Sequence, residues 1–315
     1  DPGSTRRSGR SGDVPHSLDP VEPVTVVANP AAGAGRARRL IPYLEEGLTR
    51  LGVDHQFVVS RDAHHAEEAS REAAGAGAGA VMAVGGDGQV GACANGVVGT
   101  RTALAVVPAG SGNDFARSLG LEPRRPLASL RLLLDGATKR IDVVHARGEG
   151  WDRRFVCVGG AGFDSEGNEY ANSLTRLSGT PRYVAAMLRT LVRFRMARFT
   201  IDVDGRTIRG PAWMVAVGNA PSYGGGMRIV PDAEVDDGLL DLCVVGAFSK
   251  PDFLRTFPKV FKGTHVAHPK VQTMRGRRAV LSADRPFEAY ADGERLGPLP
   301  ATFTVEPGAL EVVAP

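Results

Sequence analysis

The stretch Ala80 to Asp87, AVMAVGGD, followed by Gly88, decides the fold predicted for this chain. Its apolar run, Val81 to Val84, is typical of a buried parallel strand. Open α/β sheets bind ligands at the carboxyl ends of their strands, where this glycine loop begins. Glycines let backbone N–H groups approach an anion closely, while Asp87 can hold a metal ion or order the loop. A tight turn between a strand and a helix would show the same pattern, so this loop alone does not establish a site.

Two further predicted strands end in loops of small residues. Val24 to Ala28 runs into Asn29 to Gly35 (NPAAGAG), and Leu104 to Val107 runs into Pro108 to Ala116 (PAGSGNDFA). The first loop precedes a predicted helix that begins at Arg36, a candidate cation for phosphate. Loops of this kind suit phosphate binding by backbone amides. Because the carboxyl ends of parallel strands meet at one edge, we expect the three loops to converge there.

Composition limits the class of protein. The chain has 315 residues, 43% of them apolar, which is enough for a real core and two domains. Its 38 basic and 35 acidic residues give a net charge of +3, too even to favour nucleic acid as a partner. The three cysteines form no disulfide framework and no zinc spacing, which favours a reducing, cytoplasmic compartment. No apolar run reaches the roughly 18 residues of a membrane span.

The sequence pattern changes after a predicted helix from Pro123 to Leu134. Short strand-like runs follow, including Phe155 to Val158 and Ala301 to Val305, and Asp204-Gly205 is predicted to form a hairpin turn. Many strands with few helices predict a second, antiparallel domain, a β-sandwich. We therefore predict a disordered tail over 1–20, an α/β domain over 21–138 and a β-sandwich domain over 139–315. The pattern leaves open that the last strands return toward the first domain.

One insertion in the second domain, Asn168 to Arg198, is predicted to be helical. It mixes large apolar side chains with several arginines. A helix of this composition can be an amphipathic cover that faces lipid, or a helix packed on the sandwich. The sequence leaves both readings open.

Eight motifs, in order along Val24 to Ala314, resemble the diacylglycerol kinase catalytic-domain family of bacterial soluble lipid kinases, related to sphingosine and ceramide kinases. The motifs are Asn29-Pro30…Gly33, Gly85-Gly86-Asp87-Gly88, Pro108-Ala109-Gly110-Ser111-Gly112-Asn113-Asp114-Phe115-Ala116, Ala161-Gly162-Phe163-Asp164, Gly218-Asn219…Gly224-Gly225-Gly226, Val230-Pro231-Asp232-Ala233…Asp236-Asp237-Gly238 with Leu240-Asp241, His268-Pro269-Lys270, and Ala291-Asp292-Gly293-Glu294. NAD kinases share a GGDG motif, but the later motifs do not fit them.

The resemblance implies a Rossmann-like α/β nucleotide domain followed by a β-sandwich lipid-binding domain. It implies transfer of the γ-phosphoryl group of ATP to the hydroxyl of diacylglycerol, giving phosphatidic acid, with ATP and Mg²⁺ as cofactors. The implied partner is the inner face of the membrane, bound peripherally, and a homodimer is left open. The alternatives are a kinase for another lipid alcohol, a sphingoid base or ceramide, and a catalytically weak regulator that binds lipid or nucleotide.

The resemblance also assigns site residues. Glu294 matches the general base, with Asp292 beside it on the same side of an extended segment. Asp237, with the backbone carbonyls of Glu234 and Leu239, matches a structural Mg²⁺ site, while Asp87, Asp114 and Asp142 are candidates to meet catalytic Mg²⁺. The nucleotide positions are Asn29, Pro30, Ala31, Ala32, Gly33, Ser60, Gly85, Gly86, Asp87, Gly88, Gln89, Gly110, Ser111, Gly112, Asn113 and Asp114.

The chain departs from the family pattern at two positions of the GGDG segment. The usual pattern has Thr directly after the motif and Glu four positions beyond its last glycine. Here those positions hold Gln89 and Ala92. Gln89 keeps a polar side chain, whereas Ala92 removes a carboxylate that contacts nucleotide in many relatives. The departures concern nucleotide affinity or identity, not the fold.

Overall fold

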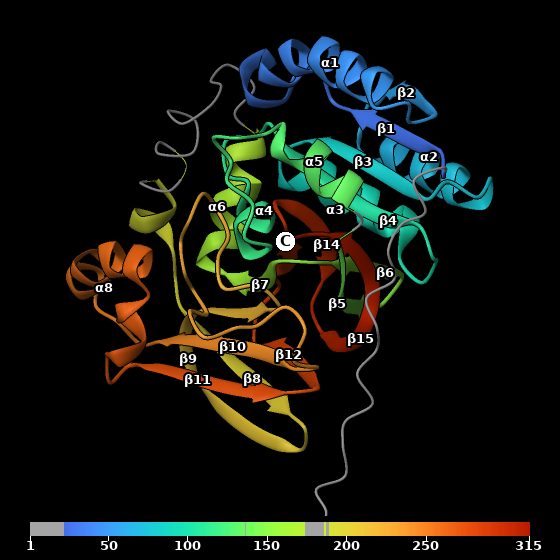
Figure 1. Ribbon diagram of the computed structural model, residues 1–315. Helices are drawn as coiled ribbons and strands as arrows, with labels where there is room; N and C mark the ends of the chain where they lie inside the picture. Colours follow the sequence, from blue (N-terminus) through green and yellow to red (C-terminus); the bar gives the residue numbers. More distant parts are fainter. Residues whose placement is uncertain (1–21, 136, 174–185, 187–188) are drawn as a thin grey trace, which may run out of the picture.

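A computed structural model describes residues 22–135, 137–173, 186 and 189–315 of the chain (Figure 1). The predicted tail over 1–20 and much of the predicted insertion over 168–198 lie outside these residues. The described part has an α/β half followed by an antiparallel β-sandwich-like half, which confirms the predicted fold class.

The α/β half is a parallel sheet with the strand order β4-β3-β1-β2. Its elements are β1 (Val24–Ala28), α1 (Ala32–Arg50), β2 (His55–Val59), α2 (Ala63–Gly75), β3 (Ala80–Gly85), α3 (Asp87–Val97), β4 (Ala103–Pro108), α4 (Asp114–Ser118) and α5 (Ala128–Asp135). Side chains of α1 and α5 pack on one face, and those of α2 and α3 on the other. Strands buried on both faces read as continuous apolar runs, which explains why the sequence reveals them.

The second half is mainly antiparallel. Its elements are β5 (Thr138–Gly148), β6 (Trp151–Phe155), β7 (Val158–Gly162), α6 (Phe163–Ser173), β8 (Ala197–Val203), β9 (Arg206–Gly218), β10 (Leu240–Gly246), α8 (Lys250–Thr256), η1 (Phe257–Lys262), η2 (Thr264–Ala267), β11 (Val271–Gly276), β12 (Arg278–Ala283), β13 (Glu288–Ala291), β14 (Glu294–Pro298) and β15 (Ala301–Val313). Asp204 and Gly205, with φ of 49° and 85°, form the predicted turn between β8 and β9.

The last strand returns to the first half, as the sequence pattern left open. β15 pairs antiparallel with β5 and β12, and its end forms a parallel bridge with β4 at Val312 and Leu104. The predicted strand Ala301 to Val305 is therefore too short. The observed strand continues to Val313, past an irregularity in its pairing with β5 between Glu306 and Leu310.

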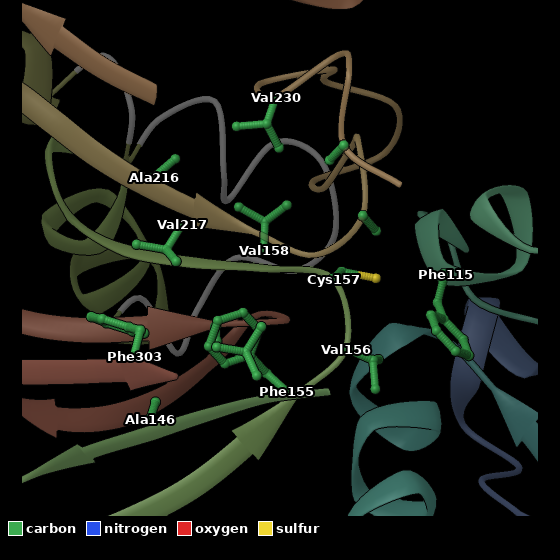
Figure 2. Close-up of a cluster of buried hydrophobic side chains, with 14 of the residues drawn as sticks. Phe115, Ala146, Phe155, Val156, Cys157, Val158, Ala216, Val217, Val230 and Phe303 are labelled. Carbon is green, nitrogen blue, oxygen red and sulfur yellow. The ribbon is translucent and has the colours of Figure 1, made fainter. Parts of the chain in front are cut away.

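One buried cluster crosses the boundary between the two halves. Figure 2 shows the segment from Phe155 to Val158 running between the β-strands and the helices of the α/β half. Phe155 packs edge-to-face on Phe303 of β15, with ring centroids 6.2 Å apart. The Cys157 side chain points to the side on which Phe115 of α4 lies, and both belong to the same cluster.

Two other predicted elements were wrong in their bounds. Phe155 to Val158 is not one strand, because β6 ends at Phe155 and β7 begins at Val158. The N–H groups between these strands donate to the carboxylate of Asp292, not to a neighbouring strand. The helix predicted from Pro123 begins at Ala128, after a turn in which Ala128 N donates to Arg125 O.

The shared core predicts that the two halves unfold together. Trp213, which is 2% exposed, and Trp151 both report on the second half, whereas far-UV circular dichroism is dominated by the helices, most of which, among the described residues, lie in the first. In urea we expect tryptophan fluorescence and circular dichroism to give coincident transitions, because separating the halves would expose the common cluster. Two transitions with different midpoints would contradict this.

Candidate active site

The three glycine loops meet at the carboxyl ends of the parallel strands, as predicted. A Cβ atom on Gly110 would lie 2.3 Å from Gly86 Cα, and one on Gly33 would lie 2.0 Å from the carbonyl oxygen of Ala109. Real Cβ atoms do not tolerate such distances, so the loops can approach only because these positions are glycine. The result is a compact rim of backbone that joins β1, β3 and β4.

The first loop takes a left-handed path before the helix begins. Gly33, Ala34 and Gly35 have φ of 59°, 55° and 82°, so the regular part of α1 starts near Arg36, as predicted. Arg36 Nε donates to Ala109 O at 3.2 Å, and its Nη2 donates to Gly110 O. The guanidinium therefore clamps the first loop onto the third, instead of standing open to a phosphate as the sequence suggested.

Ser60 and Gln89 lie together at the ends of β1 and β2. Ser60 Oγ is 3.1 Å from Gln89 Oε1 and 3.1 Å from Ala28 O, and Gln89 Nε2 donates to Val27 O at 3.2 Å. Both side chains are buried. The structure thus accommodates Gln89 as a link between α3 and the strand ends, and its contact with a nucleotide stays a prediction.

Asp87 and Asp114 order the third loop from two sides. Asp87 Oδ1 accepts a hydrogen bond from Phe115 N at 3.1 Å. Asp114 accepts from Ser222 Oγ at 3.1 Å and from Gly225 N at 2.6 Å, both in a loop of the second half. Sequence reasoning quoted the glycine run that contains Gly225 but gave it no role. The signal in the sequence was the run of three consecutive glycines, residues 224–226, which in the structure all have positive φ, a conformation that glycine adopts readily.

The Asp292-Gly293 turn positions the predicted base. Both residues have positive φ, 50° and 87°, the conformation of a two-residue hairpin turn between β13 and β14. Glu294 is the first residue of β14, and its Oε1 would lie 3.3 Å from a Cβ on Gly88. Burial raises the pKa of this carboxyl. A carboxylate of the second half therefore sits against the GGDG loop of the first.

Asp292 points elsewhere, which corrects the expectation that it shares an extended segment and a side with Glu294. Its carboxylate accepts hydrogen bonds from the backbone N–H groups of Val156, Cys157 and Val158 at 2.9, 3.1 and 3.1 Å. Burial raises its pKa to about 7, with the three N–H groups opposing the shift and the charge of Asp87 adding to it. Asp292 is thus a positioning residue that fastens the hairpin to the β6–β7 connection.

The rim is electrostatically suited to a cation that arrives with phosphates. Burial raises the pKa of Asp87, and the charge of Asp114 raises it further. Among the described residues, no group of three or more Asp, Glu, His or Cys is placed to hold a metal ion. Mg²⁺ bound with a nucleotide commonly takes only one or two carboxylates, the phosphates and waters supplying the rest. Asp87 fits that limited role. Asp114 lies beside it, with Arg117 Nη1 at 3.4 Å from its Oδ1 at the exposed side of the loop.

At the predicted structural Mg²⁺ site, the Asp237 carboxylate pairs with an arginine side chain. Asp237 Oδ2 pairs with Arg275 Nη2, and Asp237 Oδ1 accepts from Leu239 N at 3.0 Å. Arg275 Nε also pairs with Asp241 at 3.0 Å. Asp142, a candidate for the catalytic metal, instead accepts from Gly238 N and Gly308 N. A guanidinium already neutralises the Asp237 carboxylate, so these residues as arranged do not fit Mg²⁺, and the ion stays a prediction.

Fold and site together define a two-domain protein in which a glycine-loop rim is met by a carboxylate hairpin from the second domain. A family model described as the diacylglycerol kinase catalytic domain matches residues 23–146, and one described as the YegS C-terminal NAD kinase beta sandwich-like domain matches residues 157–314. A diacylglycerol kinase of Mycobacterium tuberculosis (strain ATCC 25618 / H37Rv) is 37% identical over 294 residues, covering 93% of this chain and 95% of that protein.

More distant relatives cover the chain as fully. A diacylglycerol kinase of Bacillus subtilis (strain 168) is 25% identical over 293 residues, 92% of this chain and 95% of its own length. A crystal structure of a diacylglycerol kinase from Bacillus anthracis str. Sterne superimposes with a TM-score of 0.68 at 22% identity, covering 93% of this chain and 97% of that one, and so supports the fold. The chain belongs to the diacylglycerol kinase family.

We expect Gly33→Ala to destabilise the rim more than Gly35→Ala. Both glycines have positive φ, so each alanine costs about 1–2 kcal/mol of unfolding free energy. Only at Gly33 does the new Cβ also meet backbone, the Ala109 carbonyl, while nothing lies within 4 Å of a Cβ on Gly35. Urea unfolding measures both losses, and equal losses would show that the first and third loops are not in contact.

We expect Arg275→Met to lower the melting temperature and Mg²⁺ to recover part of the loss. The substitution leaves Asp237 and Asp241 without their cation, at a cost of about 1–2 kcal/mol for a half-exposed pair. Melts without nucleotide, with and without Mg²⁺, measure it, and the exposed Arg277→Met is the matched control. If wild type instead shows a Mg²⁺-dependent rise that Asp237→Asn abolishes, the ion binds Asp237 despite Arg275.

Proposed function

We propose that the protein transfers the γ-phosphoryl group of ATP to the primary hydroxyl of diacylglycerol, giving phosphatidic acid and ADP. The observation that carries the proposal is the contact of Glu294 with Gly88, because it joins a candidate base to a candidate phosphate loop across two domains. Phosphoryl transfer needs such positioning and charge stabilisation more than it needs covalent chemistry.

In this reaction Glu294 acts as the general base. Its ionised carboxylate accepts the proton of the lipid hydroxyl as that oxygen forms its bond to the γ-phosphorus. The bond between the γ-phosphorus and the bridging oxygen breaks, and the electron pair leaves with ADP. Glu294 then releases its proton to water. The raised pKa of this carboxyl makes it a stronger base than an ordinary glutamate.

The remaining groups hold the nucleotide. Backbone N–H groups of the three glycine loops would receive its phosphates. Asp87 and Asp114 would hold the Mg²⁺ that accompanies it, which supplies charge neutralisation on the phosphate oxygens. Asp114 is also the residue to which Ser222 and Gly225 bind, so the nucleotide rim is fastened to the lipid-binding domain at this point.

We propose that the protein acts at the inner face of the membrane. No helix among the described residues is long and apolar enough to cross a membrane, while the proposed substrate is a membrane lipid. We infer peripheral binding to the inner face. The free state of Cys93, Cys157 and Cys243 is consistent with a reducing compartment.

A substrate panel tests the acceptor. ADP release is measured with mixed micelles of diacylglycerol, monoacylglycerol, sphingosine or ceramide. Highest activity on diacylglycerol supports the proposal. A preference for a sphingoid base or ceramide would instead identify a kinase for another lipid alcohol. Activity on none, with nucleotide still bound, would favour the alternative of a catalytically weak regulator that binds lipid or nucleotide.

We expect Glu294→Gln to lower kcat by about 10²–10⁴-fold, the usual contribution of a general base, with little change in ATP affinity. Glutamine keeps the size and hydrogen bonding of the side chain but cannot accept the proton. Glu288→Gln, at the other end of the same hairpin, is the matched control and should stay within a few-fold of wild type. A kcat for Glu294→Gln within the same range would remove Glu294 from the mechanism.

The pH dependence gives an independent readout of the same group. The base works only when ionised, so kcat falls as the pH drops through the Glu294 pKa. Because burial raises that pKa, the fall should begin above the ordinary glutamate range. The acidic limb of the kcat profile should be absent from the residual activity of Glu294→Gln and present in Glu288→Gln.

A further inference from the structure

The segment of α8 and η1, residues 250–262, presents large apolar side chains to solvent. Leu254, Phe257 and Phe261 are 53%, 41% and 51% exposed. They recur at helical spacing along one side of the segment, while Phe253 and Val260 are buried on the other. We call the three exposed side chains with the exposed basic residues around them the aromatic-basic patch. Figure 1 shows α8, in orange, at the left edge of the molecule.

The patch is held firmly by the core beneath it. Phe253 stacks on Trp213 with ring centroids 4.4 Å apart, Phe257 stacks on Phe253 at 6.1 Å, and Phe261 meets Phe257 edge-to-face at 6.2 Å. Ser249 caps α8 by accepting a hydrogen bond from Asp252 N at 3.2 Å. The exposed rings therefore continue an aromatic row that begins in the core, and they do not belong to a frayed end.

The charge of the segment is one-sided. Residues 250–262 contain four basic residues and one acidic residue, a net charge of +3. The basic side chains Lys250, Arg255, Lys259 and Lys262 are all exposed. The single carboxylate, Asp252, is already bonded to Ser249 and lies 3.6 Å from Arg255. Lys250 also donates to the carbonyl of Val192, a residue 73% exposed, which extends the apolar area.

The patch is connected to the active-site rim through one loop. Arg228 N donates to Val260 O of η1 at 3.0 Å. The same loop carries Ser222 and Gly225, the two partners of Asp114. The patch is therefore separated by one loop from the residues that contact the glycine rim.

We propose that the aromatic-basic patch docks on an anionic lipid bilayer, with Leu254, Phe257 and Phe261 among the headgroups and the lysines on the phosphates. The pairing of large apolar side chains with a basic surround is the pattern of interfacial binding. A second copy of the chain fits less well, because a symmetric contact would bring the same cations of both copies together. The proposal rests on the proposed function in one respect: docking brings the glycine-loop rim and Glu294 to the membrane that contains the lipid substrate.

Vesicle co-sedimentation of the full chain tests the docking. Vesicles of phosphatidylcholine with phosphatidylglycerol are compared with vesicles of phosphatidylcholine alone. We expect binding to the anionic vesicles, weakened by roughly tenfold or more in Lys259→Glu/Lys262→Glu, since each basic residue near such a surface contributes about 1 kcal/mol. Arg206→Glu/Arg209→Glu, a pair of exposed arginines on β9, is the matched charge control and should bind like wild type.

The apolar part is tested separately with Leu254→Ser/Phe261→Ser, which should weaken binding to the anionic vesicles at any salt concentration. Tyr43→Ser/Leu51→Ser removes two side chains that are 61% and 44% exposed elsewhere, and it should leave binding unchanged. Because all substituted side chains are exposed, melting temperatures should stay close to wild type. If both patch variants bind vesicles as well as wild type does, the proposal is overturned. It is also overturned if light scattering shows that wild type is a dimer and that only the patch variants are monomers.

Activity on a short-chain, water-soluble diacylglycerol separates this proposal from the proposed function. Patch variants that keep this activity but lose activity on vesicle-borne diacylglycerol support both. If wild type phosphorylates neither form while its vesicle binding still depends on the patch, the kinase proposal fails and the docking stands. If the patch variants lose activity on the soluble substrate as much as on vesicles while folded, the patch acts on the catalytic site, and docking is not its role.

Discussion

The buried carboxylate of Asp292 is the interaction on which the site depends. It accepts hydrogen bonds from the N–H groups of three consecutive residues, 156–158. It therefore joins the β13–β14 hairpin to the β6–β7 connection, which lies where the two halves of the molecule meet. Together with the pairing of β13 with β7, this bond holds the hairpin whose Glu294 lies against Gly88. The bond has a cost. Since burial raises the folded-state pKa to about 7, the unfolded chain releases this proton more easily, and the contribution of Asp292 to stability falls as pH rises from its ordinary value toward 7. The three N–H donors limit that loss.

Close backbone packing is the second constraint, and glycine makes it possible. The rim has no room for a Cβ at Gly33 or Gly110, and Arg36 then closes the gap by donating to two carbonyls of the third loop. A residue that looks like a phosphate ligand in the sequence is thus part of the frame. Arg275 shows the same relation, because it supplies a cation where the family pattern implied a metal. In both places a positive charge holds oxygen atoms of the protein itself.

The parallel strands and the convergence of the loops could be predicted because both follow from local signals, an apolar run and the glycines after it. The direction of Asp292 could not, since an Asp-Gly turn fixes φ but not the partner of the carboxylate. The segment Phe155 to Val158 reads as a strand because it is apolar. It is apolar because it crosses the common core, and its hydrogen bonds go to a residue more than 130 positions away. The roles of Gly225 and Arg275 were missed for the same reason, because only the tertiary fold identifies their partners.

The return of β15 to β4 and β5 decides how the two halves can work together. β15 pairs with β4 of the first half and with β5 of the second, and one buried cluster contains both Phe115 and Phe303. These contacts leave little freedom for the halves to separate. The base and the phosphate loops are then pre-organised, and the lipid hydroxyl has to reach them from outside. For an acceptor held in a bilayer, the orientation of the protein on that surface becomes part of positioning the reactants. This is why the aromatic-basic patch, one loop away from Asp114, belongs to the same physical argument as Glu294.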